Sequence, residues 1–172
     1  MSRPLAYLIT FITYGTWMHG DGRGSAGRDG NNQFGEEYVP PDPSRVLFER
    51  SELVGEPYRM DDARRSIVLA AIRDVCSHRG WSLHAVHVRS NHLHVVVSGD
   101  RTPERVMNDF KSYASRRLNA AKCDPADCRR WTRHGSTRYL WTEDHVRAAV
   151  RYVVEGQGDP MAVYDATSEA RP

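Results

Sequence analysis

Residues 81–98 read WSLHAVHVRSNHLHVVVS. Apolar and β-branched residues dominate both halves, and the polar residues 89–91 separate them, which is typical of two antiparallel strands joined by a short turn. Side chains alternate between the two faces of a sheet along each strand. In the second strand we therefore expect the apolar residues between the histidines and after them on one face, and His92 and His94 together on the other.

The rest of the chain predicts three helices and two further strands around this hairpin. They are a buried strand at 5–14, helices at 61–80, at 103–123 and from 142 onward, and a short strand at 139–141. Residues 124–137 are polar and predict a loop. This order of elements favours an α+β fold in which helices cover one face of an antiparallel sheet.

Residues 15–60 interrupt the regular pattern between the first strand and the first helix. Seven glycines lie between Gly15 and Gly35, and four prolines follow before the helix begins. Such a composition predicts a long loop or an inserted arm. We expect one domain over residues 1–165 that includes this arm, followed by a disordered tail at 166–172.

Composition excludes several classes of protein. No apolar run approaches the ~18 residues of a membrane span, and the N-terminus lacks the charged, apolar and small-residue regions of a signal peptide. Three cysteines are too few, and odd in number, for a disulfide framework. We therefore expect a soluble, cytoplasmic protein that has no membrane partner.

Positive charge is concentrated in residues 101–138, which hold ten Lys or Arg against four Asp or Glu, although the net charge of the chain is only +2. Aromatic residues are interspersed with these cations, so the segment could follow a phosphate backbone and stack unpaired bases. A solvated face of helix and loop explains the same pattern. Nucleic-acid binding therefore needs a second, independent feature.

His92 and His94 form half of a metal site. Two neutral imidazoles side by side bind divalent transition metals, and a third ligand from elsewhere in the chain would complete an open site. The alternative is a pair of histidines on a solvated strand face. His84 and His87 on the preceding strand differ in parity, so at most one of them should share the face of this pair.

Tyr152 is a candidate nucleophile on the last predicted helix. At 100° per residue, it lies on the flank of the apolar stripe that contains Val146, Val150 and Val153. Its ring can therefore pack while its hydroxyl reaches a cleft, although a phenol attacks poorly unless a metal or a general base assists it. The alternative is a tyrosine at the edge of the core with no chemical role.

Together these features resemble the single-tyrosine HUH transposases, a family that includes the small IS200-like insertion-sequence transposases and the REP-associated tyrosine transposases. The resemblance rests on the N-H-x-H strand, the basic helix FKSYASRRL at 110–118, Leu140-Trp141, and RYVVEGQ at 151–157. It covers residues 5–14 and 61–158 in the same order and leaves the 15–60 arm unexplained.

The resemblance implies a ferredoxin-like sandwich with the histidines on a central strand and the tyrosine on a C-terminal helix. It implies that His92, His94 and Gln157 bind Mg²⁺ or Mn²⁺ at the scissile phosphate of a single-stranded DNA hairpin. Tyr152 would then form a 5′-phosphotyrosine and release a 3′-hydroxyl, and the 3′-hydroxyl of a second strand could reverse the step, which gives strand transfer without hydrolysis. DNA contacts are implied for the basic helix, at Lys111, Tyr113, Arg116 and Arg117.

One position departs from the family pattern. Family members often carry Gln or Asn four residues after the tyrosine, whereas this chain has Gly156 there and the glutamine one position later. On a regular helix Gln157 points about 140° away from Tyr152, unless Gly156 ends the helix and turns the chain back. The departure keeps an alternative function open, a catalytically inactive module that binds structured DNA or RNA. A homodimer is also open, because the family contains both dimers that share active sites and members that act alone.

Overall fold

The computed structural model describes residues 2–15, 43–44, 47, 51 and 55–170, so most of the predicted 15–60 arm lies outside the described residues. Within that part of the chain, no helix is long and apolar enough to cross a membrane. The elements from the first strand to the last helix are β1 (Ala6–Thr13), α2 (Asp62–Arg79), β2 (Ser82–Val88), β3 (His92–Ser98), α3 (Pro103–Ala120), β4 (Trp131–Leu140), α4 (Glu143–Glu155), β5 (Ala162–Asp165) and α5 (Ala166–Glu169).

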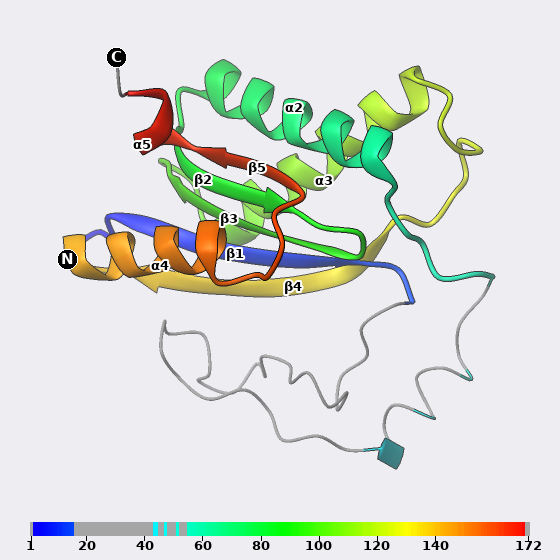
Figure 1. Ribbon diagram of the computed structural model, residues 1–172, viewed down its shortest axis with the longest axis horizontal. Helices are drawn as coiled ribbons and strands as arrows, with labels where there is room; N and C mark the ends of the chain where they lie inside the picture. Colours follow the sequence, from blue (N-terminus) through cyan, green and yellow to red (C-terminus); the bar gives the residue numbers. More distant parts are fainter. Residues whose placement is uncertain (1, 16–42, 45–46, 48–50, 52–54, 171–172) are drawn as a thin grey trace.

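The five strands form an antiparallel sheet in the order β4-β1-β3-β2-β5 (Figure 1). The histidine strand β3 is at the centre, between β1 and β2. Its partners run from Tyr7↔Val97 to Ile12↔His92 on the β1 side. The predicted α+β fold with an antiparallel sheet is confirmed, and the order of the first four strands is that of a ferredoxin-like sandwich.

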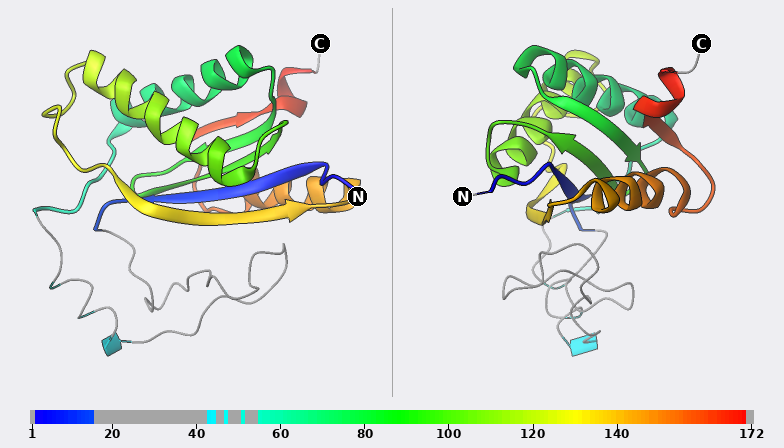
Figure 2. Two further views of the ribbon diagram at one scale, coloured as in Figure 1. Left: turned by 180° about the vertical axis from the view of Figure 1, so that it is seen from behind. Right: turned by 90° about the vertical axis from the view of Figure 1, so that its left-hand side faces the viewer.

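Helices lie on both faces of this sheet (Figure 2). On one face α2 and α3 pack side by side, and their apolar side chains join a core that includes Phe11 and Leu93. On the other face α4 buries Ala149 and Val153 against a smaller cluster that includes Val96. The predicted arrangement is confirmed, with helices α2 and α3 on one face and a separate tyrosine-bearing helix. This separate helix, α4, covers the opposite face of the sheet.

Side-chain caps set the helix boundaries. The side chain of Asp61 accepts a hydrogen bond from the amide of Arg64 at the start of α2, and Thr142 accepts one from His145 at the start of α4. Helix α2 ends at Gly80, whose φ of 69° is a left-handed conformation that favours glycine. The sequence predicts that α2 starts at Asp61 and ends at Gly80 and that α4 starts at Thr142, and these three boundaries are confirmed.

The predicted loop at 124–137 is wrong over its second half, because residues 131–137 belong to β4 and pair with β1. Gly135, opposite Phe11, hides the strand from a sequence reading because glycine is depleted in strands. A Cβ at this position would lie 2.5 Å from Met107 Sδ and 2.5 Å from the carbonyl oxygen of Thr10. Glycine here therefore allows β4 to approach both β1 and α3 closely.

The C-terminal segment contains two elements that the sequence analysis did not anticipate. Strand β5 pairs with β2 from Ala85↔Asp165 to Val88↔Ala162. Helix α5 follows it directly, and Arg73 of α2 forms an ion pair with Glu169 at 3.0 Å. The predicted disordered tail at 166–172 thus contains a short helix, and residues 171–172 lie outside the described residues.

A nearly buried carboxylate joins α2, the loop after α3 and β4. Asp124 accepts hydrogen bonds from the Tyr58 hydroxyl at 2.8 Å, from Arg64 Nη2 at 2.8 Å and from Arg130 Nε at 3.1 Å. Burial by itself would raise the pKa of Asp124, but these three donors outweigh burial and hold that pKa below its usual value. The carboxylate is therefore charged in the folded protein and forms ion pairs with two arginines.

Asp124→Ala should lower the free energy of unfolding by about 3 kcal/mol, because it leaves the buried Arg130 without its carboxylate. The folded-state pKa is lower than the unfolded one, so this stabilisation is present above about pH 4 and is lost as pH falls through the folded-state pKa. Urea denaturation at neutral pH and at about pH 3 measures both effects. The difference in the free energy of unfolding between wild type and the isosteric control Asp124→Asn should be smaller at the lower pH. An equal difference at both pH values would contradict a stabilising charge on Asp124.

Candidate active site

His92 and His94 lie on the sheet face that α4 covers, and their ring centroids are 5.0 Å apart. His94 is only 2% exposed, and its neighbours across the sheet are Thr10 of β1 and His87 of β2. His92 is half-buried at the start of β3, beside the turn that joins the hairpin. The strand alternation therefore brings the two imidazoles together at one end of the central strand.

Both rings are oriented by an oxygen atom at Nδ1. His94 Nδ1 lies 2.7 Å from Thr10 Oγ1, and His92 Nδ1 lies 2.7 Å from Asn91 Oδ1. With Nδ1–H donating to these oxygens, each ring carries its lone pair on Nε2, as a metal-binding histidine does. Burial, followed by the nearby His92, lowers the pKa of His94 to about 3, so this ring is neutral at neutral pH.

Tyr152 of α4 lies directly against this pair. Its ring contacts His94 edge to face, with the centroids 5.4 Å apart and the planes at 71°. Ala149 and Val153 are fully buried and seat α4 on the sheet, whereas Tyr152 is half-buried on the flank of that contact. The packing of α4 therefore positions a phenol beside the histidines, within the same chain.

The side chain of Gln157 reaches the site because α4 ends at Glu155, just before it. Gly156 donates its amide to the carbonyl oxygen of Tyr152 at 3.0 Å, and Gln157 Nε2 donates to the same oxygen at 3.2 Å. The Gln157 side chain also acts on His94, where it raises the pKa of that histidine against the effect of burial. The structure thus brings His92, His94, Tyr152 and Gln157 together.

This donor set fits a divalent cation. In the part of the chain that the structure describes, no three His, Cys, Asp or Glu side chains are grouped so that they could hold a metal. The ligands on offer are therefore the Nε2 atoms of His92 and His94 and the amide oxygen of Gln157, whose nitrogen is occupied by Tyr152. Two imidazoles and one amide oxygen leave coordination positions for phosphate oxygens and water.

Two further histidines lie on this face of the sheet. His87 is fully buried opposite His94. His84 Nε2 lies 2.7 Å from the hydroxyl of Ser98, whose side chain is on the same face of β3 as that of His94. The expectation that at most one of them shares the face is wrong, because a β-bulge at His84 shifts the parity of β2. Burial lowers the pKa of both rings, which favours their neutral forms.

Lys111, a predicted DNA contact, is buried instead. Its ammonium group donates to the carbonyl oxygens of Thr132 at 2.9 Å and His134 at 3.2 Å, and burial lowers its pKa to about 8. The side chain also lies over the ring of Phe11, on the sheet face away from the histidines. Lys111 therefore joins α3 to β4 and is not presented to a phosphate backbone, which corrects the prediction.

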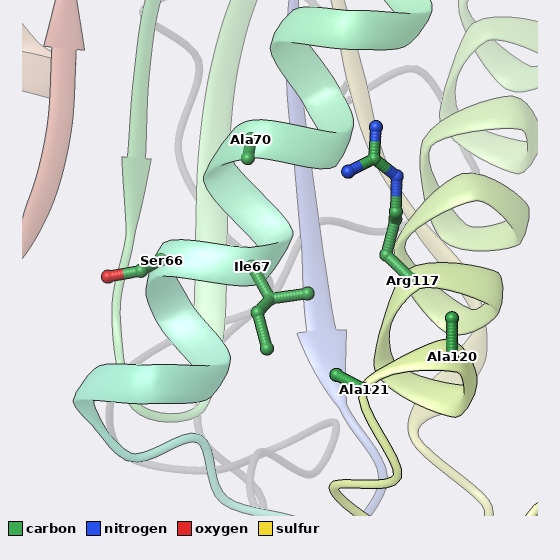
Figure 3. A pocket seen from close by; sticks show the side chains of 6 residues that line it. All are labelled: Ser66, Ile67, Ala70, Arg117, Ala120 and Ala121. Atoms are coloured by element: carbon green, nitrogen blue, oxygen red, sulfur yellow. The ribbon is translucent and has the colours of Figure 1, made fainter.

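The other three predicted DNA contacts lie on the layer formed by α2 and α3. Arg116 is exposed and lies over the ring of Tyr113 at 5.0 Å, and Arg117 forms an ion pair with Asp74 of α2. Beside Arg117 an open, mainly apolar groove of about 410 Å³ runs between the two helices (Figure 3). Six residues line it: Ser66, Ile67, Ala70, Arg117, Ala120 and Ala121. All of this surface is on the far side of the sheet from Tyr152, so it can meet DNA only away from that tyrosine.

Gly156→Ala tests the turn that returns Gln157. A Cβ at this position would lie 2.7 Å from the carbonyl oxygen of Tyr152. Crowding of this kind costs about 1–3 kcal/mol, which exceeds the gain of about 0.4–1 kcal/mol from a less flexible unfolded chain. We expect the free energy of unfolding to fall by about 1 kcal/mol in urea denaturation. Glu155→Ala, an exposed neighbour, is the matched control with little effect, and equal stability of both variants and wild type argues against a tight turn.

Comparison with known protein families assigns part of this chain to one family. Residues 58–146, more than half of the chain, match the family described as Transposase IS200 like. The matched segment includes the histidine strand and ends before Tyr152. No curated protein sequence matches the chain.

Solved structures that are similar to this protein include two transposases. A REP-associated tyrosine transposase bound to a REP hairpin has a TM-score of 0.47 and 13% identity, covering 91% of this chain and 72% of that one. A protein of Deinococcus radiodurans R1 assigned as a transposase has a TM-score of 0.43 and 15% identity, covering 91% of this chain and 93% of that one. On the family match over residues 58–146, the chain belongs to the IS200-like transposase family.

Proposed function

We propose that this transposase is a metal-dependent single-stranded DNA endonuclease and strand transferase. One observation carries the proposal: the Tyr152 ring contacts His94, with the ring centroids 5.4 Å apart, and Gln157 is bonded to the carbonyl oxygen of the same tyrosine. A phenol beside two imidazoles and an amide would be a nucleophile next to a cation site, and this combination can carry out phosphoryl transfer to tyrosine.

His92, His94 and Gln157 would hold Mg²⁺ or Mn²⁺. A bound divalent cation supplies positive charge at the scissile phosphate and favours loss of the phenol proton nearby. The protein contributes orientation, because Thr10 and Asn91 hold the Nδ1 sides of the two rings. Burial of His94 keeps its ring neutral and therefore able to act as a ligand.

Tyr152 would act as the nucleophile. Its oxygen forms a bond to the phosphorus while the bond from phosphorus to the 3′-oxygen breaks, its proton passes to water, and the leaving 3′-oxygen takes up a proton. The products are a 5′-phosphotyrosine and a free 3′-hydroxyl. Attack by the 3′-hydroxyl of a second strand on the phosphotyrosine reverses these bond changes and joins the two strands.

A single-stranded DNA hairpin is the proposed substrate. The related REP-associated transposase is bound to a REP hairpin. The exposed Arg116 and the neighbouring Tyr113 would contact parts of the hairpin away from the cleavage site, because α3 and α4 lie on opposite faces of the sheet. Lys111 has no part in this surface, since its ammonium group is buried.

The test is to incubate the protein with Mn²⁺ and labelled single-stranded DNA hairpins that have random flanks. A denaturing gel should show label attached covalently to the protein. Tyr152→Phe should abolish this band, because it removes the attacking oxygen and keeps the ring that packs on His94. His92→Ala should also abolish it, because it removes one proposed ligand.

Tyr139→Phe is the matched control, since it removes the hydroxyl of another half-buried tyrosine, which lies on the other side of the sheet and has no part in the proposed DNA contacts. Its band should equal that of the wild type. A band that persists in Tyr152→Phe refutes this nucleophile. Tight hairpin binding by the wild type without any covalent band, in the same tubes, contradicts the enzyme and favours the inactive binding module.

A further inference from the structure

His87 has no role in the proposed chemistry, yet it is completely buried next to the site. Its Nδ1 lies 3.1 Å from the carbonyl oxygen of Val153, and its Nε2 accepts a hydrogen bond from the amide of Met161 at 3.0 Å. A carbonyl oxygen can only accept and an amide can only donate. The ring is therefore the neutral tautomer with its proton on Nδ1, and both of its nitrogens are engaged.

These two bonds hold the two ends of one short segment. Val153 follows Tyr152 in the last turn of α4, and Met161 immediately precedes β5. Between them the chain contains two glycines, of which Gly158 has a φ of 77°, and it carries Gln157. Glycine-rich backbone has many conformations available, so this turn needs external contacts to keep one shape.

Arg89 adds a third contact of the same kind. Its Nη1 donates to the carbonyl oxygen of Asp159 at 2.8 Å and lies 3.4 Å from His87 Nε2. Residues 153, 159 and 161 are thus all bonded through their backbone to side chains near the end of β2. His87 is the only one of these anchors that reaches both α4 and the residue before β5.

A role as a metal ligand does not fit His87, although it lies opposite His94. A ligand nitrogen needs a lone pair directed at the metal, and the lone pair of His87 Nε2 is directed at the Met161 amide. The other nitrogen carries the proton that Val153 accepts. His87 therefore acts on the site through the backbone it holds.

We propose that His87 is a positioning residue, which fixes the end of α4 and the following turn so that Tyr152 and Gln157 stay against His94. This inference rests on the proposed function for its catalytic consequence. Its structural consequence, a rigid segment from Tyr152 to Met161, is independent of that function. The two consequences can therefore be measured separately.

His87→Leu removes both hydrogen bonds and fills the buried position with an apolar side chain of similar size. Amide hydrogen exchange should become about tenfold faster at residues 153–156 and at Met161, while the first turn of α4 is unchanged. The rate of covalent adduct formation should fall at least about tenfold, because a displaced nucleophile loses its alignment. The hairpin dissociation constant should stay within about twofold of wild type, since His87 is not at the surface.

Two controls separate positioning from general loss of stability. His84→Leu changes the same residue type on the same strand and face, where the ring bonds Ser98 instead of α4, and it should leave both the local exchange and the rate near wild type. Leu118→Ala weakens the core on the other face of the sheet and should speed exchange broadly without a specific loss of rate. His87→Asn can still donate to Val153, so it should recover part of the rate.

Each outcome decides between the claims. If the wild type forms the adduct and His87→Leu matches it in rate, or loses rate only as Leu118→Ala does, the positioning role is wrong. If the wild type forms no adduct, the proposed function fails, and exchange alone decides the inference. Faster exchange confined to residues 153–161 then supports the anchor, and unchanged or uniformly faster exchange overturns it.

Discussion

Strand β3 is hydrogen-bonded on both edges and covered by helices on both faces, so the position of each of its residues is determined. Every second side chain enters the core formed with α2 and α3, and the side chains between them face α4. A shift of one residue would place His94 in the apolar core and Leu93 against α4, which burial strongly opposes. The register of this one strand therefore determines where the histidine pair lies.

The chemistry depends on a second constraint, the way α4 ends. Its buried residues seat the helix and place Tyr152 beside His94, but Gln157 reaches the site only because the helix stops at Gly156. The carbonyl oxygen of Tyr152 accepts hydrogen bonds from the Gly156 amide and from the Gln157 side chain. The candidate nucleophile and the candidate ligand therefore share one turn of backbone. Gln157 departs from the family pattern in sequence, yet its side chain lies against Tyr152 beside the histidine pair.

Strong local signals made much of the fold and site predictable. The alternation of His92 and His94 with apolar residues, the cap at Asp61 and the stop at Gly80 are each encoded by a few adjacent residues. The grouping of Tyr152 with the histidines required the family resemblance, because the two segments are sixty residues apart and no spacing rule joins them.

Features that depend on tertiary contacts could not be predicted. Gly135 looks like a loop residue, and only the closeness of Met107 and β1 explains why a strand needs it there. Lys111 looks like a surface cation, yet two carbonyl oxygens hold it inside. The bulge at His84 and the bonds of His87 to α4 and Met161 arise from pairings that a single sequence does not reveal.

The central claim is that His92, His94 and Gln157 form a cation site against Tyr152. Anomalous scattering from crystals of the wild-type protein soaked in Mn²⁺ tests it most directly, because it locates the metal without requiring a substrate. The account predicts a peak within coordination distance of Nε2 of both histidines and of the Gln157 amide oxygen, beside the Tyr152 ring. A peak bound elsewhere, or no peak at the histidine pair in Mn²⁺-saturated crystals, would contradict it.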